Sequence, residues 1–180
     1  MRDPDVRQNQ QGIDYLLSQG RIERVEPNQR AAERLLEQAR LHIASARNLS
    51  ETPDLALAFT AAYDGARKSL AAMLLIQGLR ARGGEGGHAV LLDVVRPQFP
   101  DHRQALQRFD WLRTIRNNTE YPDIDTPPVT SRDVSDGIAA ASDILKVAQA
   151  FAARGSAQPD SPSADGLASV TAVELGDADG

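Results

Sequence analysis

The chain has 180 residues, of which 41% are hydrophobic and only 4% are aromatic. This length is enough for one domain with a proper core, but not for two full domains. The absence of cysteine excludes disulfide frameworks, thiolate metal sites and cysteine nucleophiles. Alanine and leucine are abundant and runs of β-branched residues are absent, which favours close-packed helices over sheets. The sequence therefore predicts an all-α domain.

The formal net charge of −5 is concentrated in the C-terminal segment. Residues 155–180 contain five acidic side chains and neither lysine nor arginine, so the rest of the chain is neutral overall. That balance gives no sign of a surface for long duplexes. The N-terminus has no apolar signal region, and no stretch approaches the ~18 apolar residues of a membrane span. We therefore expect a cytoplasmic protein that does not contact the membrane.

Residues 1–27 are expected to form an N-terminal arm. The first 12 residues are polar and expected to be loose. A short helix then starts at Ile13 and is stopped by Gly20, and a brief extended piece reaches Val25. We expect this arm to pack on the main body, with docking of a partner as the alternative.

A bundle of helices is expected over residues 28–153. The first helix runs from Asn28, a good N-cap, to about residue 49. The second begins with Thr52 as its cap and Pro53 at its first position. Its apolar stripe continues until Gly78, which makes it the central helix of the bundle.

A glycine-rich loop and a broken third helix follow the central helix. The loop at 82–87 lacks the Gly-Lys-Ser/Thr ending of a phosphate-binding P-loop. His88 begins a short apolar helix, where it is expected to cap or pack. The third helix is expected to start at Asp101 and to end at Tyr121, before Pro122.

The last helix is predicted from a capping-box spacing between Thr130 and Asp133. It is expected to reach about residue 153, with Gly155 as its stop. Residues 154–180 are rich in Ser, Pro, Asp, Ala and Gly and hold few large apolar side chains. Such a tail cannot offset its ordering entropy, so we expect it to be disordered.

Arg116 falls in the middle of an apolar face of the third helix. At about 100° per residue, it shares that face with Leu106, Phe109 and Leu112. Burying an unpaired charge costs several kcal/mol, so the position needs partner groups or lines an occupied polar cleft. The alternative is an ordinary arginine that caps the last carbonyls or extends its head into water.

Two residues of the central helix, Tyr63 and Asp64, are the candidate partners of Arg116. With Arg67 and Lys68, Asp64 also forms a charged patch in the middle of that helix. On its own, such a patch is typical of a solvated face with weak local ion pairs.

The order of these features resembles a HEPN domain. Two long helices are followed by a glycine-rich loop that ends in a histidine, a broken third helix that ends in Arg-Asn, and a fourth helix. The resemblance covers residues 28–153. It rests on Ala62-Tyr63-Asp64-Gly65-Ala66-Arg67-Lys68-Ser69-Leu70, Gln77-Gly78-Leu79-Arg80, Gly87-His88 and Arg113-Thr114-Ile115-Arg116-Asn117-Asn118-Thr119-Glu120-Tyr121.

This resemblance implies an antiparallel four-helix bundle, usually a homodimer in which the Arg-Asn motifs of two subunits meet in one cleft. Many members of the family are metal-independent RNases that act as toxins in toxin–antitoxin and other defence systems. Many of the small ones are encoded beside a nucleotidyltransferase antitoxin. The family pattern has a catalytic His four to six residues after the Arg, whereas this chain has Tyr121 after four.

RNA cleavage without a metal needs a base for the 2′-OH proton, an acid for the leaving oxygen, and positive charge on the phosphorane. The resemblance implies that Arg116, Asn117, Glu120 and Tyr121 are the catalytic candidates. Arg113 and Arg116 would bind phosphate, since a guanidinium does so in a bidentate manner. Tyr63, Asp64, Arg67 and His88 would support the site, and neither a metal nor a cofactor is expected.

Tyrosine is a poor base at neutral pH, since its ordinary pKa is about 10, but Tyr121 can position a phosphate or the 2′-OH. Burial would raise the pKa of Glu120 toward that of a useful base, whereas a neighbouring Arg would lower it.

Two other functions remain open from the sequence. The first is a nucleotide-binding or adaptor subunit without catalysis that acts with a partner nucleotidyltransferase. Tyr121 would then accept a nucleotidyl group. The second is a helical scaffold, which predicts that Arg116→Leu stabilises the fold, because an apolar side chain avoids the cost of a buried charge.

Overall fold

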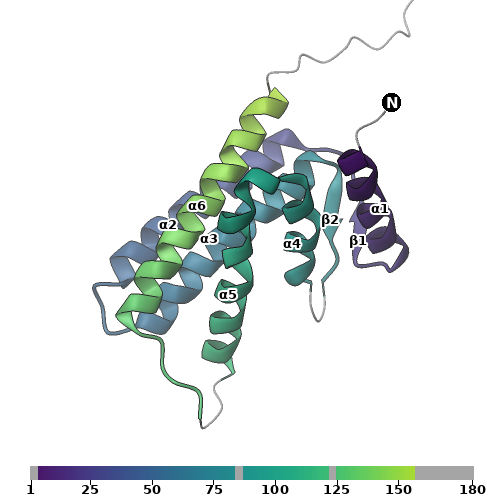
Figure 1. The fold of residues 1–180 in the computed structure, drawn as a ribbon. Helices are drawn as coiled ribbons and strands as arrows, with labels where there is room; N and C mark the ends of the chain where they lie inside the picture. Colours follow the sequence, from purple (N-terminus) through teal and green to yellow (C-terminus); the bar gives the residue numbers. More distant parts are fainter. Residues whose placement is uncertain (1–3, 84–86, 122–124, 157–180) are drawn as a thin grey trace, which may run out of the picture.

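The computed structural model describes residues 4–83, 87–121 and 125–156 (Figure 1). The elements in chain order are α1 (Pro4–Ser18), β1 (Ile22–Arg24), α2 (Gln29–Leu49), α3 (Leu55–Ile76), β2 (Leu79–Ala81), α4 (Ala89–Val95), the 3₁₀ turns η1 (Arg96–Gln98) and η2 (Pro100–His102), α5 (Arg103–Glu120) and α6 (Ser131–Ser156). Within the described residues helices predominate and the one sheet has two strands. The prediction of an all-α fold is confirmed.

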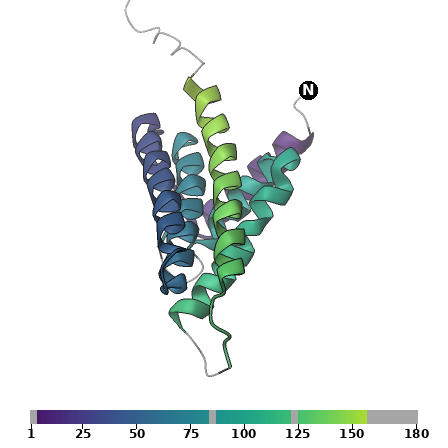
Figure 2. The same ribbon diagram turned by 90° about the vertical axis from the view of Figure 1, so that its left-hand side faces the viewer.

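Four long helices form the body of the molecule. Helices α2, α3 and α6 run side by side, and α5 crosses this group at an angle (Figures 1 and 2). Helix α3 is central, since it contacts α2, α4, α5 and α6. The predicted inward residues Phe59, Tyr63 and Leu70 of α3, and Leu106 and Leu112 of α5, are all buried. The apolar stripe of each helix therefore faces the common core.

The starts of three helices test the predicted caps. Asn28 caps α2 as expected, with its side-chain oxygen 2.8 Å from the N–H of Ala31. The prediction of Thr52 and Pro53 for α3 is wrong, because Asp54 is the cap and accepts a hydrogen bond from the N–H of Leu57 at 3.0 Å. Thr52 donates instead to the carbonyl of Leu49. This stretch offers two good N-cap side chains within three residues, and the structure uses the second.

The capping box of α6 is confirmed. Thr130 Oγ1 accepts from the N–H of Asp133 at 3.2 Å, and Asp133 Oδ2 accepts from the N–H of Thr130 at 2.9 Å. The helix extends to Ser156, so the predicted stop at Gly155 is early. The predicted start of the third helix at Asp101 is early as well, because a 3₁₀ turn covers Pro100–His102 and α5 follows it. Both differences fall at helix ends, where tight turns and fraying shift the boundary by one or two residues.

The N-terminal arm differs most from the expectation. Residues 1–12 were expected to be loose, but α1 begins at Pro4 and reaches Ser18. Leu16 is buried, and Ile13 and Leu17 pack against the core beside it, so one apolar face anchors a helix whose first half is polar. The chain then turns at Gly20, which has a positive φ of 64°.

The extended piece after Gly20 forms a small antiparallel sheet. Strand β1 pairs with β2 so that Ile22 lies opposite Ala81 and Glu23 opposite Arg80. Gly78, which ends α3 as predicted, has a positive φ of 68° and directs the chain into β2. The sheet therefore attaches the arm to the end of the central helix.

Several expectations concern parts outside the described residues. They are the disordered state of most of the acidic tail, the centre of the glycine-rich loop at 84–86, and the role of Pro122. Strand β2 (Leu79–Ala81) directly precedes that loop.

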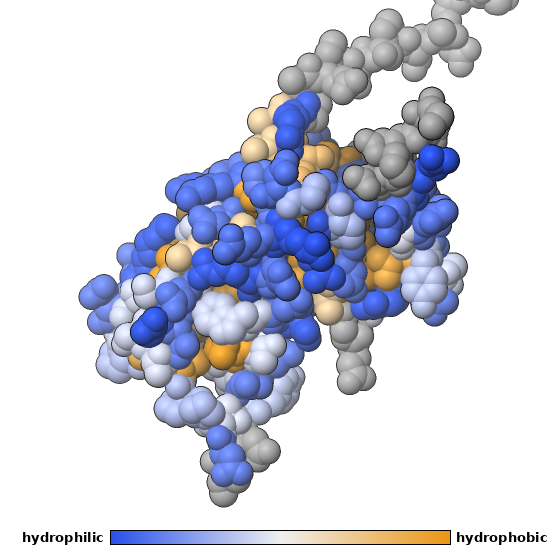
Figure 3. Space-filling model, viewed as in Figure 1, coloured by the Kyte–Doolittle hydropathy of each residue, from blue (hydrophilic) through white to orange (hydrophobic). Residues whose placement is uncertain are grey.

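The face of the molecule in Figure 3 is mostly hydrophilic, with apolar side chains visible between the charged ones. Among the described helices, none is both long and apolar enough to cross a membrane.

Candidate functional site

Arg116 lies where the periodicity of α5 placed it, against the centre of the bundle. Its side chain is only 23% exposed. The carbon of its guanidinium lies 5.7 Å from the centre of the Tyr63 ring, within the range of a cation–π contact. Its Nη2 is 2.7 Å from Glu120 Oε2, and its Nη1 donates to Asn117 Oδ1 at 3.4 Å. Tyr63, and not Asp64, is thus the partner from the central helix.

The burial of this arginine has a cost. Among the described residues, the Nε atoms of Arg113 and Arg116 are the buried side-chain atoms without a hydrogen-bond partner. A buried donor left unpaired costs about 1–3 kcal/mol. Arg113 has a loose ion pair, at 3.8 Å from Asp110. Each of the two arginines therefore keeps a buried N–H donor that no group of the described residues satisfies.

Tyr63 connects α3 with the residues around it. Its side chain is 1% exposed, and its ring stacks on Phe109 with 5.6 Å between the ring centres. Its hydroxyl forms a hydrogen bond of 2.7 Å with His88 Nδ1. Burial raises the pKa of Tyr63 to about 12, although the charges of Arg67 and Arg116 oppose the rise. The hydroxyl therefore stays protonated at neutral pH.

His88 is exposed and enters the site from the start of α4. It was expected to cap or pack. Its side chain makes no capping hydrogen bond to α4, but its ring packs against Tyr63, with 6.0 Å between the ring centres, and is hydrogen-bonded to the Tyr63 hydroxyl. Although the residue as a whole is exposed, partial burial of its ring lowers the pKa of His88 below the ordinary 6.5, and the charges of Arg67 and Arg116 lower it further. The imidazole is therefore neutral at pH 7 and can accept a proton.

The charged patch of α3 is only partly as expected. Asp64 Oδ1 lies 3.1 Å from Arg67 Nε, and Asp64 Oδ2 lies 4.0 Å from Nδ1 of His42 on α2. Lys68 does not join this pair, because it donates to Gln38 at 3.0 Å. The charges of Asp64 and Arg67 both affect the pKa of His88, and Arg67 lines the same cavity as His88.

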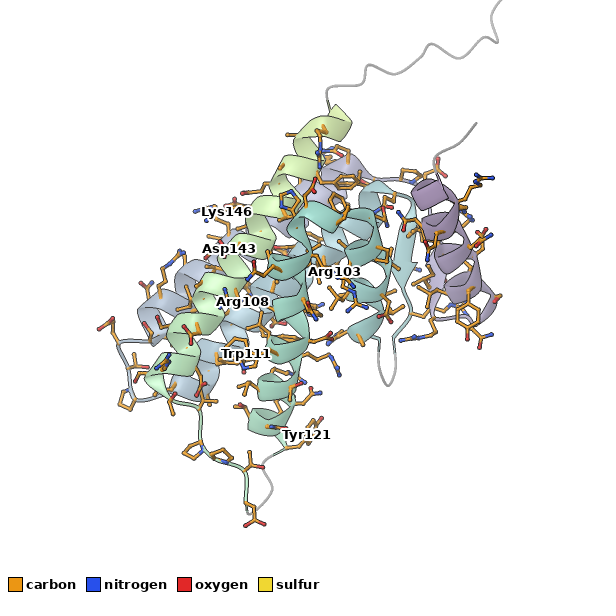
Figure 4. The ribbon with its side chains drawn as sticks, in the orientation of Figure 1. Arg103, Arg108, Trp111, Tyr121, Asp143 and Lys146 are labelled. Atoms are coloured by element: carbon orange, nitrogen blue, oxygen red, sulfur yellow. The ribbon has the colours of Figure 1, made fainter. Side chains whose placement is uncertain are left out.

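The structure thus brings most of the predicted residues together around Tyr63. Tyr121, predicted to replace the family histidine, is 78% exposed and lies at the end of α5 (Figure 4). Its backbone N–H binds the carbonyl of Asn117, and both side chains face solvent. In the described part of the chain, no three His, Cys, Asp or Glu side chains gather closely enough to hold a metal ion.

Two substitutions at Tyr63 distinguish the contribution of its hydroxyl to stability from that of its ring. Tyr63→Phe keeps the stacking on Phe109 and is expected to lower the free energy of unfolding by about 1 kcal/mol, the usual worth of one hydrogen bond. Tyr63→Ala leaves a cavity in the core and is expected to cost about 3–5 kcal/mol. Urea unfolding of the three proteins measures both values. Equal losses in the two variants would contradict a separate role for the ring.

A comparison with the curated proteins and one with the solved structures give no match. A family model described as the HEPN domain matches residues 32–151, which are most of the chain and include every residue of the site around Tyr63. The chain therefore belongs to the HEPN domain family.

Proposed function

We propose that this protein is a toxin-type RNase that cleaves RNA without a metal ion. The observation that supports this most is the contact of Tyr63 with two groups, the guanidinium of Arg116 above its ring and the imidazole of His88 at its hydroxyl. These two groups can supply the fixed positive charge and the neutral base that metal-free cleavage needs, and water can supply the acid. The chain lacks the histidine of the family motif, and His88 supplies one from another part of the fold.

The proposed reaction is a transfer within the RNA strand. In the tautomer of His88 that acts as base, the proton stays on Nδ1 and this N–H donates a hydrogen bond to Tyr63 Oη, while Nε2 is unprotonated. Nε2 takes the proton of a 2′-hydroxyl, the 2′-oxygen bonds to phosphorus, and the bond from phosphorus to the 5′-oxygen breaks. The 5′-oxygen takes a proton from water, and the imidazolium returns its proton to the solvent. The products are a 2′,3′-cyclic phosphate and a 5′-hydroxyl end.

The arginines would hold the phosphate during this reaction. Arg113 and Arg116 lie one turn apart on α5, and Arg67 of α3 lines one cavity together with His88. A guanidinium binds two phosphate oxygens at once and stabilises the charge that develops on them. In the homodimer expected for this family, the site of a second subunit would add to this charge. A nucleotidyltransferase antitoxin is the expected partner.

Cleavage of RNA in the presence of EDTA tests the proposal. We expect the purified protein to cut single-stranded RNA with the chelator present, and to leave cyclic phosphate ends. Induction of its gene alone in a heterologous host is expected to arrest growth. Arg116→Ala, purified in the same way, controls for contaminating nucleases. RNA that stays intact under all conditions, with no arrest of growth, would contradict the RNase.

The exposure of Tyr121 favours a second candidate function. Its hydroxyl lies at a helix end and is free of the core, so an enzyme can reach it. The protein would then be an adaptor that accepts a nucleotidyl group from a partner nucleotidyltransferase. Intact mass after incubation with that enzyme and ATP tests this role: an unchanged mass of the wild type would count against it.

A further inference from the structure

A cavity of about 310 Å³ opens beside the candidate site. It lies between the second half of α3, strand β2 and the start of α4, which Figure 1 shows next to one another. Its walls are largely aliphatic, with side chains from four elements: Leu35, Ala71, Leu74, Leu79 and Leu91. This volume is within the range of small-molecule sites, so the cavity is large enough for an apolar group of a small ligand.

The cavity and the site around Tyr63 have two residues in common. Arg67 and His88 line the cavity, and both also lie at the site, since the charge of Arg67 acts on His88 and His88 binds Tyr63. A single ligand can therefore extend from the arginines into the cavity. The part at the arginines would be anionic and the part in the cavity apolar.

Two more arginines stand at the cavity and are held in place. Arg80 and Arg82 both pair with Glu23 of β1, with the nearest atoms 2.6 Å and 3.4 Å apart. Strand pairing sets this contact, because Glu23 lies opposite Arg80 in the sheet. Arg67, Arg80 and Arg82 carry three positive charges at the cavity. The carboxylates of Glu23 and Asp64 balance two of them, which leaves one net positive charge. Guanidinium planes are also surfaces on which nucleobases stack.

We propose that the cavity is a nucleobase subsite, in which one base of a single-stranded RNA or of a nucleotide is held while its phosphate lies at Arg67 and Arg116. This rests on the proposed function for the phosphate position. A base inside a duplex cannot enter such a cavity without leaving its stack. The protein therefore selects unpaired RNA and excludes duplexes.

Equilibrium binding of small probes to the full chain tests the subsite. The probes are the four nucleoside 5′-monophosphates and ribose 5-phosphate, which has the same phosphate but no base. We expect at least one nucleotide to bind about tenfold more tightly than ribose 5-phosphate, as one stacked base contributes. Ala71→Phe, which fills the cavity, is expected to remove this difference, whereas Ala56→Phe, at an exposed position of the same helix, is expected to keep it.

Other outcomes would overturn the proposal. Equal binding of the nucleotides and ribose 5-phosphate, or no binding of either, would exclude a base in the cavity. Binding of octanoate, but of no nucleotide, would assign the cavity to an acyl chain. A single-stranded decamer that binds no better than a duplex would contradict the selection of unpaired RNA. These measurements need no cleavage. A protein that does not cleave RNA would therefore still show the preference for nucleotides if the subsite exists.

Discussion

Replacing Arg116 with alanine is expected to lower the rate of RNA cleavage by about 100- to 1,000-fold, as loss of one preorganised donor to a developing oxyanion does. The guanidinium is held by the Tyr63 ring below it and by Glu120 at 2.7 Å. It is thus ordered before the substrate binds and needs little rearrangement. Initial rates with a fluorescent single-stranded RNA, at equal protein concentration, measure the loss.

Arg132 supplies the matched control for this experiment. It is 90% exposed at the start of α6 and forms a long ion pair with Asp136, so Arg132→Ala removes the same charge from an exposed position on another helix. We expect it to cleave like the wild type. The melting temperature of both variants shows whether they fold. A folded Arg116→Ala protein with the full rate would contradict a catalytic role, and one that no longer folds can be replaced by Arg116→Lys, which keeps the charge but not the planar fork.

The sequence predicted the helices and the position of Arg116 because both depend on local periodicity. A period of 3.6 residues places Arg116 on the same face as Phe109 and Leu112, and the structure buries that face. The pairing of Arg116 with Glu120 four residues later is equally local. The start of α3 differs from the prediction, because Thr52 and Asp54 are both good caps and the structure uses Asp54.

The parts that the sequence did not predict are non-local. His88 and Tyr63 are 25 residues apart, and their hydrogen bond depends on how α4 folds back on α3. No spacing rule connects a histidine after a glycine-rich loop with a tyrosine in the middle of a helix. The sheet is a similar case. Its strands have three residues each, and the paired residues Glu23 and Arg80 are 57 positions apart in the sequence. Short strands carry too little pattern to be paired from sequence alone.

The sequence predicted His88 only as a supporting residue, but its replacement is the sharpest test of the proposed mechanism. His88→Ala is expected to lower the rate of cleavage by about 100-fold or more, the usual contribution of a general base. The base acts only when neutral. Partial burial and the charges of Arg67 and Arg116 lower the pKa of His88 below 6.5. The wild-type rate is therefore expected to be independent of pH at and above pH 7, and to fall in more acidic solution as the imidazole becomes protonated. This acid limb should disappear in His88→Ala.

Two further measurements separate proton transfer from a structural role of His88. Added imidazole is expected to restore part of the activity of His88→Ala, which it cannot do if the ring only supports the fold. In Arg116→Ala, one of the charges that lower the pKa of His88 is absent, so NMR titration should show a higher pKa for this ring than in the wild type. His102→Ala is the control, because His102 is exposed and makes no capping hydrogen bond to α5. An acid limb that persists without His88 would assign the base to another group, and the exposed carboxylate of Glu120 beside Arg116 would be the next to test.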